Sequence, residues 1–187
     1  MTDAVAQAMV AIARADFVPP ELRDQAKNDL PLPIGGGQTN SQPRTVANML
    51  GLLDVQPGQR VLDVGAGSGW TTALLGHLVG PEGTVIGVEL LPGLAEWGAG
   101  NIARYPMPWA RVLPAEADQL GWPEEAPYDR ILVSAQADEL PEALVRQLRP
   151  GGVLVIPVRG TMLRVRGGDA GDHEVTLHGS YRFVPLR

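Results

Sequence analysis

The residues with the clearest chemical potential form a glycine-rich turn after a short apolar run. The run spans residues 61–64, and Gly65, Gly67 and Gly69 follow it at every second position. Because glycine has no Cβ, such a turn lets a ligand approach the backbone closely. The spacing is neither the G-x-G-x-x-G of dinucleotide-binding proteins nor that of a phosphate-binding loop, which continues with Gly-Lys-Ser/Thr. Taken alone, the turn indicates either a bound ligand or merely a tight connection between a strand and a helix.

A second candidate, Glu89, stands at the end of the next apolar run. That run covers residues 84–88, and Glu89 follows Gly69 by twenty residues. A carboxylate at the tip of the neighbouring strand can accept hydrogen bonds from both hydroxyls of a ribose. An isolated glutamate after a strand is usually just solvated. With the glycine turn upstream, we expect Glu89 to bind a ribose.

The composition narrows the class of protein. The chain has 187 residues, 44% hydrophobic and 19% charged, which is typical of one soluble globular domain. No apolar run approaches the roughly 20 residues of a membrane span, and the first residues lack the layout of a signal peptide. We therefore expect a cytoplasmic protein, without membrane association.

Several kinds of chemistry are disfavoured by residue counts. The absence of cysteine excludes disulfides and thiolate chemistry, and His77, His173 and His178 lack the spacing of metal ligands. We therefore predict no metal site. A net charge of −6 with no Lys/Arg run argues against a nucleic-acid partner.

An unusual loop precedes the glycine turn. Residues 29–43 combine prolines, which fix φ, with glycines, which free it, so this segment cannot be a helix. A helix is predicted over residues 43–53, with proline at its start and Ser41 as a candidate N-cap. From composition alone, capping would be the favoured role of Ser41.

The remaining pattern predicts strands that alternate with helices. Such alternation indicates a parallel sheet with helices on both faces. We expect a Rossmann-like three-layer α/β/α sandwich with a mostly parallel seven-stranded sheet and antiparallel C-terminal strands. One domain covers residues 1–187, with N-terminal helices and the loop in 1–57 and the core in 58–187. The expected helices cover residues 5–15, 43–53, 92–104 and 139–148, with one or two helical turns in 21–28 and a helix stop at 149–152. The expected strands include residues 84–89, 110–113, 131–134 and 153–157, followed by edge strands at 162–166 and 174–177.

Two motifs resemble a known family. The acid Asp63 followed by G-x-G-x-G is similar to motif I of class I S-adenosylmethionine (AdoMet) methyltransferases. Residues 29–43 read D-x-P-L-P-I-G-x-G-Q-T-x-S-Q-P, which resembles the acceptor-site loop of protein-L-isoaspartate O-methyltransferases. Residues 17–19, 128–135, 141–144, 147–158 and 182–186 also match that family, the last as its C-terminal strand. The resemblance runs from about residue 5 to residue 186.

The resemblance implies an activity and a set of site residues. It implies transfer of a methyl group from AdoMet to the carboxylate of L-isoaspartyl residues in damaged proteins or peptides, by a monomer. A carboxylate is already ionised at neutral pH, so the reaction needs no general base. Ser41 would donate a hydrogen bond to the acceptor as the catalytic residue, and Asp29 would order the loop. The implied substrate-binding residues are Gln38, Thr39 and Gly35, and the implied cofactor-binding residues are Asp63, Gly65, Ala66, Gly67, Ser68, Glu89, Leu90, Glu116, Ala117 and Asp118.

Departures from the family pattern leave alternatives open. Ala117 stands where the family has the aspartate near the adenine, so either Glu116 or Asp118 would take that role. Asn40 replaces a usual isoleucine and would make one wall of the acceptor pocket polar, and Gln136 would lie near the reaction centre. Restoring isoleucine at position 40 is expected to maintain or raise activity. The alternatives are a methyltransferase for another carboxylate, such as a peptide aspartate, and a non-catalytic AdoMet-binding module.

Overall fold

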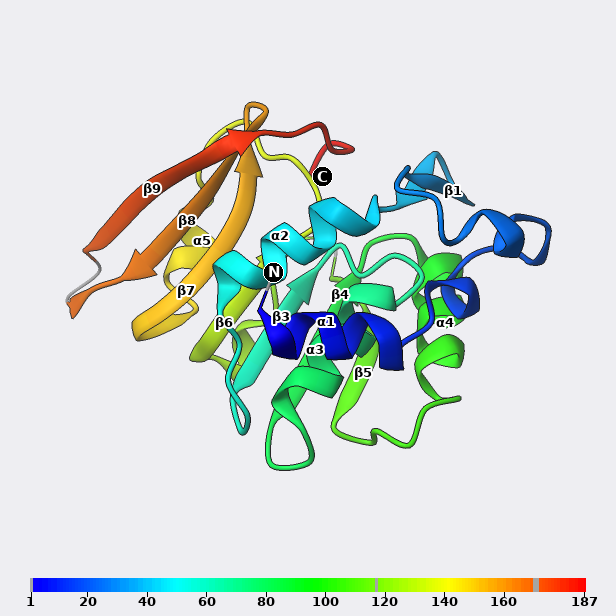
Figure 1. The fold of residues 1–187 in the computed structure, drawn as a ribbon. Coiled ribbons are helices and arrows are strands. Elements are labelled where there is room, and N and C mark those ends of the chain that lie inside the picture. Colours follow the sequence, from blue (N-terminus) through cyan, green and yellow to red (C-terminus); the bar gives the residue numbers. More distant parts are fainter. Residues whose placement is uncertain (1, 117, 170–171) are drawn as a thin grey trace.

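The computed structural model describes residues 2–116, 118–169 and 172–187 (Figure 1). The helical elements are α1 (Asp3–Ala11), η1 (Arg14–Phe17), η2 (Pro20–Gln25), α2 (Pro43–Leu53), α3 (Trp70–Val79), α4 (Pro92–Ile102), η3 (Pro123–Glu125) and α5 (Glu142–Val145). The strands are β1 (Leu32–Gly35), β2 (Gln38–Asn40), β3 (Arg60–Val64), β4 (Thr84–Glu89), β5 (Ala110–Pro114), β6 (Tyr128–Val133), β7 (Leu148–Val158), β8 (Thr161–Gly167) and β9 (His173–Ser180).

The described strands form a two-stranded hairpin and a seven-stranded sheet. The large sheet has the order β5-β4-β3-β6-β7-β8-β9. Strands β5, β4, β3, β6 and β7 run parallel, and β8 and β9 pair in the antiparallel sense. This confirms the expected fold class. The chain leaves β3 toward β4 on one side and returns to β6 on the other. In open α/β sheets, ligands bind at the carboxyl ends of strands where the order reverses in this way.

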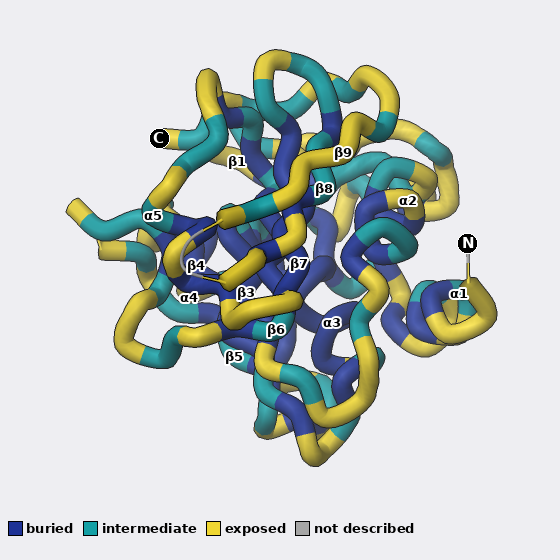
Figure 2. Tube along the Cα trace, turned by 90° about the vertical axis from the view of Figure 1, so that its left-hand side faces the viewer, coloured by how far each residue is buried: buried dark blue, intermediate teal, exposed yellow. Residues whose placement is uncertain are grey.

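Alternating strand residues build a core on each side of the sheet. Val61 of β3 belongs to the cluster that includes buried residues of α1, α2, α3 and α4, whereas its neighbour Leu62 faces the cluster under α5. Both side chains are fully buried because strands in a parallel sheet are covered on both faces. Figure 2 shows the central strands as buried and β9 largely exposed at one edge. The sheet is thus a rigid base for the loops at its carboxyl edge.

The first helix is shorter than predicted. We expected residues 5–15, but α1 ends at Ala11, and Ile12 has extended backbone angles (φ −107°, ψ 93°). The 3₁₀ turn η1 follows and buries Arg14 and Phe17. Tertiary burial of these two side chains overrides a helical pattern that would direct them elsewhere.

The predicted loop 29–43 contains a hairpin. β1 and β2 pair across Gly35, Gly36 and Gly37, all of which have positive φ. Leu32 and Ile34 are buried while Pro33 between them is exposed. Prolines are tolerated in such an edge strand, and the three glycines allow the tight return.

The N-cap prediction for Ser41 is wrong. α2 covers residues 43–53 as expected, but its N-cap is Gln42, with no side-chain capping bond. Asp29, which is remote in sequence, caps this helix instead: its Oδ1 accepts a 2.9 Å hydrogen bond from the backbone N–H of Arg44 in the first turn. A capping carboxylate 15 residues away cannot be read from the local pattern.

The C-terminal half also differs in its boundaries. The helix expected over 139–148 shrinks to α5, which starts after Pro141, since a residue before proline disfavours helical angles. The predicted helix stop 149–152 lies within β7, where the register shifts and Gly151 has φ 75°. Residues 182–186 form only an isolated bridge, between Pro185 and Gln136, instead of a strand. Among the described residues, no helix is long and apolar enough to cross a membrane.

Candidate functional site

The glycine turn lies where the sequence places it, between β3 and α3. Gly65, Gly67 and Gly69 all have positive φ, at 79°, 54° and 89°. A side chain is strained in this backbone region, so the turn requires these glycines. The backbone N–H groups of Gly65 and Ala66 donate to the carbonyl of Val88 on β4, at 2.9 and 3.1 Å. The turn is therefore held against the end of the neighbouring strand.

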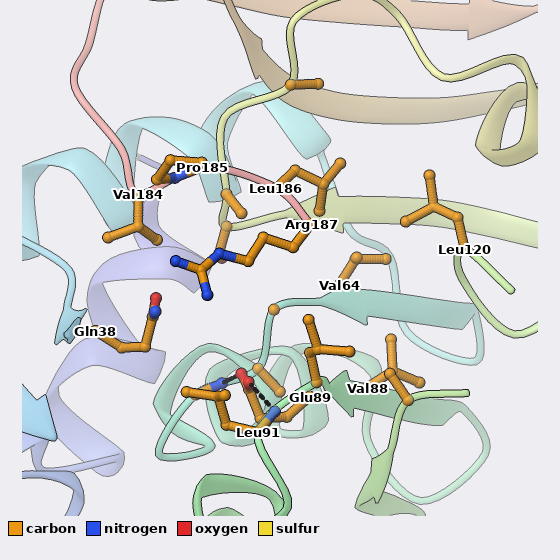
Figure 3. Close-up of a pocket in the computed structure, with 18 of the residues that line it drawn as sticks. Gln38, Val64, Val88, Glu89, Leu91, Leu120, Val184, Pro185, Leu186 and Arg187 are labelled. Atoms are coloured by element: carbon orange, nitrogen blue, oxygen red, sulfur yellow. Dashed lines mark hydrogen bonds between the residues drawn. The ribbon is translucent and has the colours of Figure 1, made fainter. Parts of the chain in front are cut away.

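Glu89, the last residue of β4, is hydrogen-bonded to the glycine turn. Its Oε2 accepts a hydrogen bond of 2.8 Å from the N–H of Gly67, and its Oε1 accepts one of 2.9 Å from the N–H of Leu91 (Figure 3). The residue is 7% exposed. Each carboxylate oxygen can accept a further hydrogen bond. Glu89 is thus held rigidly with capacity left for two hydroxyl groups of a ligand.

Asp63 supports the turn from below. It is fully buried, and its Oδ2 accepts 2.7 Å hydrogen bonds from the hydroxyls of Thr71 and Thr72 at the start of α3. Its Oδ1 has no partner among the described residues. Burial raises the pKa of Asp63 to about 6, although the two threonine hydroxyls act to lower it. Asp63 does not line the cavity described next, so its place is structural support for the turn.

A cavity of about 630 Å³ opens over the carboxyl ends of β3, β4 and β6 (Figure 3). Its walls come from the glycine turn, the hairpin loop, the segment after β5 and the last residues of the chain. The predicted site residues that line it are Gln38, Thr39, Ser41, Gly65, Ala66, Gly67, Ser68, Glu89, Leu90, Glu116 and Asp118.

Three described residues that the sequence pointed to fall outside this lining. Gly35 belongs to the hairpin but not to the cavity wall, and Asp63 lies beneath the turn. Gln136 does not line the cavity; its backbone instead bonds to residues 184 and 186. Ala117 lies outside the described residues. Glu116 and Asp118 are both exposed, and both line the cavity wall.

Arg14 is the main residue that the sequence analysis missed. Its side chain is 6% exposed and donates to carbonyl oxygens at both ends of the hairpin loop. The acceptors are the carbonyls of Ala26, Asn28, Leu30, Asn40 and Ser41, at 2.8 to 3.1 Å. Burial lowers its pKa to about 10, so the guanidinium stays charged at neutral pH. One planar cation therefore ties the base of the acceptor loop together.

Asn40 connects Arg14 to the glycine turn. Its Oδ1 accepts from Arg14 Nε at 2.7 Å, and its Nδ2 donates to the hydroxyl of Ser68 at 3.2 Å. Asn40 is 5% exposed. Although it borders the cavity, its polar atoms are already engaged in this network. The structure therefore gives Asn40 a role in joining the loop to the turn, not in making the acceptor wall polar.

Ser41 is not a helix cap, and Asp29 is not simply a solvated loop residue. None of the hydrogen bonds among the described residues involves the Ser41 hydroxyl, and Ser41 lines the cavity. Asp29 accepts from the side chain of Gln42 at 3.0 Å and forms a 3.0 Å ion pair with Arg44. The hydrogen bond from the Arg44 N–H and that from Gln42 lower the pKa of Asp29. Asp29 thus orders the loop, and Ser41 is available to a ligand.

The C-terminal segment, which the sequence predicted only as a strand, forms one wall of the cavity. Val184, Pro185, Leu186 and Arg187 line the cavity opposite Glu89 (Figure 3). Two 2.7 Å backbone hydrogen bonds hold the segment to Gln136. A signal existed in the sequence, since residues 182–186 matched a family motif, but nothing in it showed that the segment returns to the ligand site. No cluster of three potential metal ligands occurs among the residues described.

Comparison with known proteins gives one family. The family model described as "Protein-L-isoaspartate(D-aspartate) O-methyltransferase (PCMT)" matches residues 1–187. The protein-L-isoaspartate O-methyltransferase of Methanopyrus kandleri is 46% identical over 187 residues, covering 97% of this chain and 82% of that protein. The enzyme of the same name from Aeropyrum pernix is 49% identical, covering 82% of this chain and 59% of that protein.

Solved structures agree with this. The Plasmodium falciparum protein assigned as a protein-L-isoaspartate O-methyltransferase, crystallised with S-adenosyl-L-homocysteine, superposes with a TM-score of 0.87 at 27% identity, covering 100% of this chain and 91% of that one. A second structure of that enzyme name gives a TM-score of 0.89 at 26% identity, covering 100% of this chain and 62% of the other. The likeness therefore extends over the whole fold and includes a relative that holds the demethylated cofactor.

Proposed function

The chain belongs to the protein-L-isoaspartate (D-aspartate) O-methyltransferase family, a family of AdoMet-dependent enzymes, and we propose that it methylates L-isoaspartyl residues of damaged proteins and peptides. The main support for this proposal is that two walls with different residues border the same cavity. The glycine turn and Glu89 form one wall, and the acceptor loop with Gln38, Thr39 and Ser41 forms another. A cofactor and an acceptor could therefore meet in a single space.

The residues of the first wall fit AdoMet. Glu89 is fixed by two backbone N–H groups and keeps acceptor capacity for the ribose hydroxyls. A Cβ on Gly67 would lie 3.2 Å from Ile34 Cδ1, so a side chain there would press against the acceptor loop in addition to straining the backbone at φ 54°. Gly65 and Gly67 thus provide the bare backbone that the amino acid end of AdoMet requires. Leu90 and either Glu116 or Asp118 would border its adenine.

The chemistry asked of the protein is positioning. When bound, AdoMet supplies a methyl group on a sulfonium, and the acceptor carboxylate is ionised at neutral pH without a base. Ser41 donates a hydrogen bond that orients the acceptor carboxylate. Arg14 and Asp29 hold the loop that carries Ser41. Alignment and the exclusion of water by the two walls are the means by which this site accelerates transfer.

The structure weakens the case for another acceptor. Asn40 and Gln136 are the residues that favour a different carboxylate, but the polar atoms of Asn40 are bonded to Arg14 and Ser68, and Gln136 does not line the cavity. We also keep the proposals of a monomer working in the cytoplasm on peptide or protein substrates. The net charge of −6 supports a partner other than nucleic acid.

The function is tested by transfer of labelled methyl from AdoMet to an isoaspartyl peptide. A methyl ester releases methanol in mild alkali, whereas methyl groups on nitrogen or ether oxygen stay bound. We expect label in the peptide and its release as methanol. Tight binding of S-adenosyl-L-homocysteine without any transfer would instead identify a non-catalytic cofactor-binding module.

A further inference from the structure

The charges around the cavity are strongly one-sided. Among the described residues that line it, the acidic side chains are Glu89, Glu116, Asp118, Asp138 and Glu139. The basic residue among them is Arg187. Such a cavity suits the cationic sulfonium and ammonium of AdoMet. It opposes the entry of a carboxylate, because like charges repel each other over about a Debye length.

Arg187 is directed into this cavity. Figure 3 shows its side chain extending from the C-terminal segment, with the guanidinium on the side of Gln38 and above Glu89. The segment that carries Arg187 is fixed one residue earlier, where the N–H of Leu186 donates to the carbonyl of Gln136 at 2.7 Å. The N–H of Gln136 in turn donates to the carbonyl of Val184 at 2.7 Å. The cation is therefore delivered by an anchored backbone and lies beside the acceptor loop.

Building on the proposed function, we propose that Arg187 binds the carboxylate of the acceptor residue and brings it into the acidic cavity. A guanidinium presents planar N–H donors that match a carboxylate. It holds one carboxylate oxygen and leaves the other free to attack, while Ser41 supplies the second contact from the acceptor loop. Arg187 is thus a specificity residue for an anionic acceptor.

The reaction removes the negative charge to which Arg187 binds. In the transfer, the bond between methyl carbon and sulfur breaks, its electron pair stays on sulfur, and the carboxylate oxygen forms the new bond to carbon. The acceptor changes from an anion to a neutral ester. The attraction to Arg187 is therefore strongest before transfer, is weaker in the transition state and is lost in the product. An interaction of this kind lowers KM but does not raise kcat.

This gives a test with a clear kinetic signature. In Arg187→Gln, the KM for an isoaspartyl peptide should rise about tenfold, the size of one lost hydrogen bond between charged groups. The kcat should be unchanged or slightly higher, and Arg187→Lys should restore part of the loss in KM. The matched control is Arg182→Gln, because Arg182 is exposed on the same segment and does not line the cavity. It removes the same charge and should leave KM unchanged.

Salt provides a second readout. From about 0.01 M to 1 M salt, the screening length falls from about 30 Å to 3 Å. Salt screens both the attraction to Arg187 and the repulsion by the acidic side chains, so the ratio of the KM of Arg187→Gln to that of the wild type should fall toward one over this range, whereas the ratio for Arg182→Gln should stay near one. A protein in which Arg187 is only structural would show the same salt dependence in all three.

Two results would overturn the proposal. One is an equal KM in Arg187→Gln and Arg182→Gln. The other is a weakened affinity of Arg187→Gln for S-adenosyl-L-homocysteine in calorimetry, since this would assign Arg187 to the carboxylate of the cofactor. If the wild-type protein methylates no isoaspartyl peptide, the proposed function itself is wrong and the role of Arg187 falls with it. Wild-type transfer with equal variants rejects only the role of Arg187.

Discussion

Arg14 and Asn40 are 26 residues apart in the chain and are joined by a 2.7 Å hydrogen bond from the guanidinium Nε to the amide Oδ1. The amide of Asn40 continues this connection to the hydroxyl of Ser68 in the glycine turn. The N-terminal segment, the acceptor loop and the turn beside the cofactor site are thus linked through buried side chains. Arg14 also lies over the ring of Trp70, 5.4 Å from its centroid, which adds a cation–π contact.

Asn40→Ile should destabilise this arrangement. Isoleucine removes the partner of Arg14 Nε and of the Ser68 hydroxyl, so the free energy of unfolding should fall by about 1–3 kcal/mol. Methylation of an isoaspartyl peptide should fall as well, contrary to the expectation from the family pattern alone. Urea denaturation and a methylation assay measure both effects. Asn48→Ile is the control, since Asn48 is exposed on α2; an Asn40 variant as stable and active as this control would show that the link is dispensable.

Glu89→Gln should weaken binding of the cofactor. The amide places an N–H donor against the N–H of Gly67 or Leu91, which now donate to the two carboxylate oxygens. The affinity for S-adenosyl-L-homocysteine should fall by about 1–3 kcal/mol in calorimetry. Glu82→Gln removes the same charge at an exposed turn and should bind normally. Equal affinity of both variants would mean that Glu89 does not contact the ligand.

Asp63 should make stability depend on pH in a defined direction. Its pKa is raised by burial, from 3.8 to about 6, so the folded protein binds a proton more readily than the unfolded chain. The stabilisation from the protonated group is therefore complete below about pH 4 and is lost as the pH rises through about 6. The shift corresponds to roughly 3 kcal/mol.

The Asp63→Asn variant isolates this contribution. The difference in unfolding free energy between wild type and Asp63→Asn, from urea titrations at several pH values, should favour the wild type more at pH 4 than at pH 7. A difference that is constant over this range would show that the pKa of Asp63 is not raised.

Ser41→Ala should affect catalysis without affecting stability. Ser41 lines the cavity and its hydroxyl does not cap α2, so its removal should lower kcat/KM for an isoaspartyl peptide by about tenfold to a hundredfold. The affinity for S-adenosyl-L-homocysteine should stay the same. Ser180→Ala, on the exposed strand β9, controls for loss of a hydroxyl. A loss of about 1 kcal/mol of stability with normal turnover would restore the capping role.

The framework of the fold could be predicted because it depends on local pattern. The apolar runs before Gly65 and at 84–88 specify buried strands, and their glycine and acid endings specify the edge where the ligand binds. Pro43 marks the start of α2 correctly for the same reason, since proline suits the first position of a helix.

The contacts that complete the site could not be predicted because they depend on distant residues. Arg14 follows a helical pattern in the sequence, and only the folded chain shows that it turns inward to three carbonyls of the acceptor loop and two just before it. Likewise, Asp29 caps a helix that starts 14 residues later, and Arg187 reaches the cavity through a bridge to Gln136. Their partners become neighbours only through the topology of the sheet.

In the proposed function, this cavity methylates the carboxylate of an isoaspartyl residue. The most direct measurement compares kcat/KM for two peptides of identical sequence that differ only in an isoaspartyl or an aspartyl linkage. Both carry a carboxylate, so charge alone cannot separate them, and only a loop shaped for the altered backbone can. We predict base-labile methylation of the isoaspartyl peptide and little or none of the aspartyl one. Equal methylation of both peptides, or transfer to the aspartyl peptide alone, would show that the cavity does not recognise the isoaspartyl linkage.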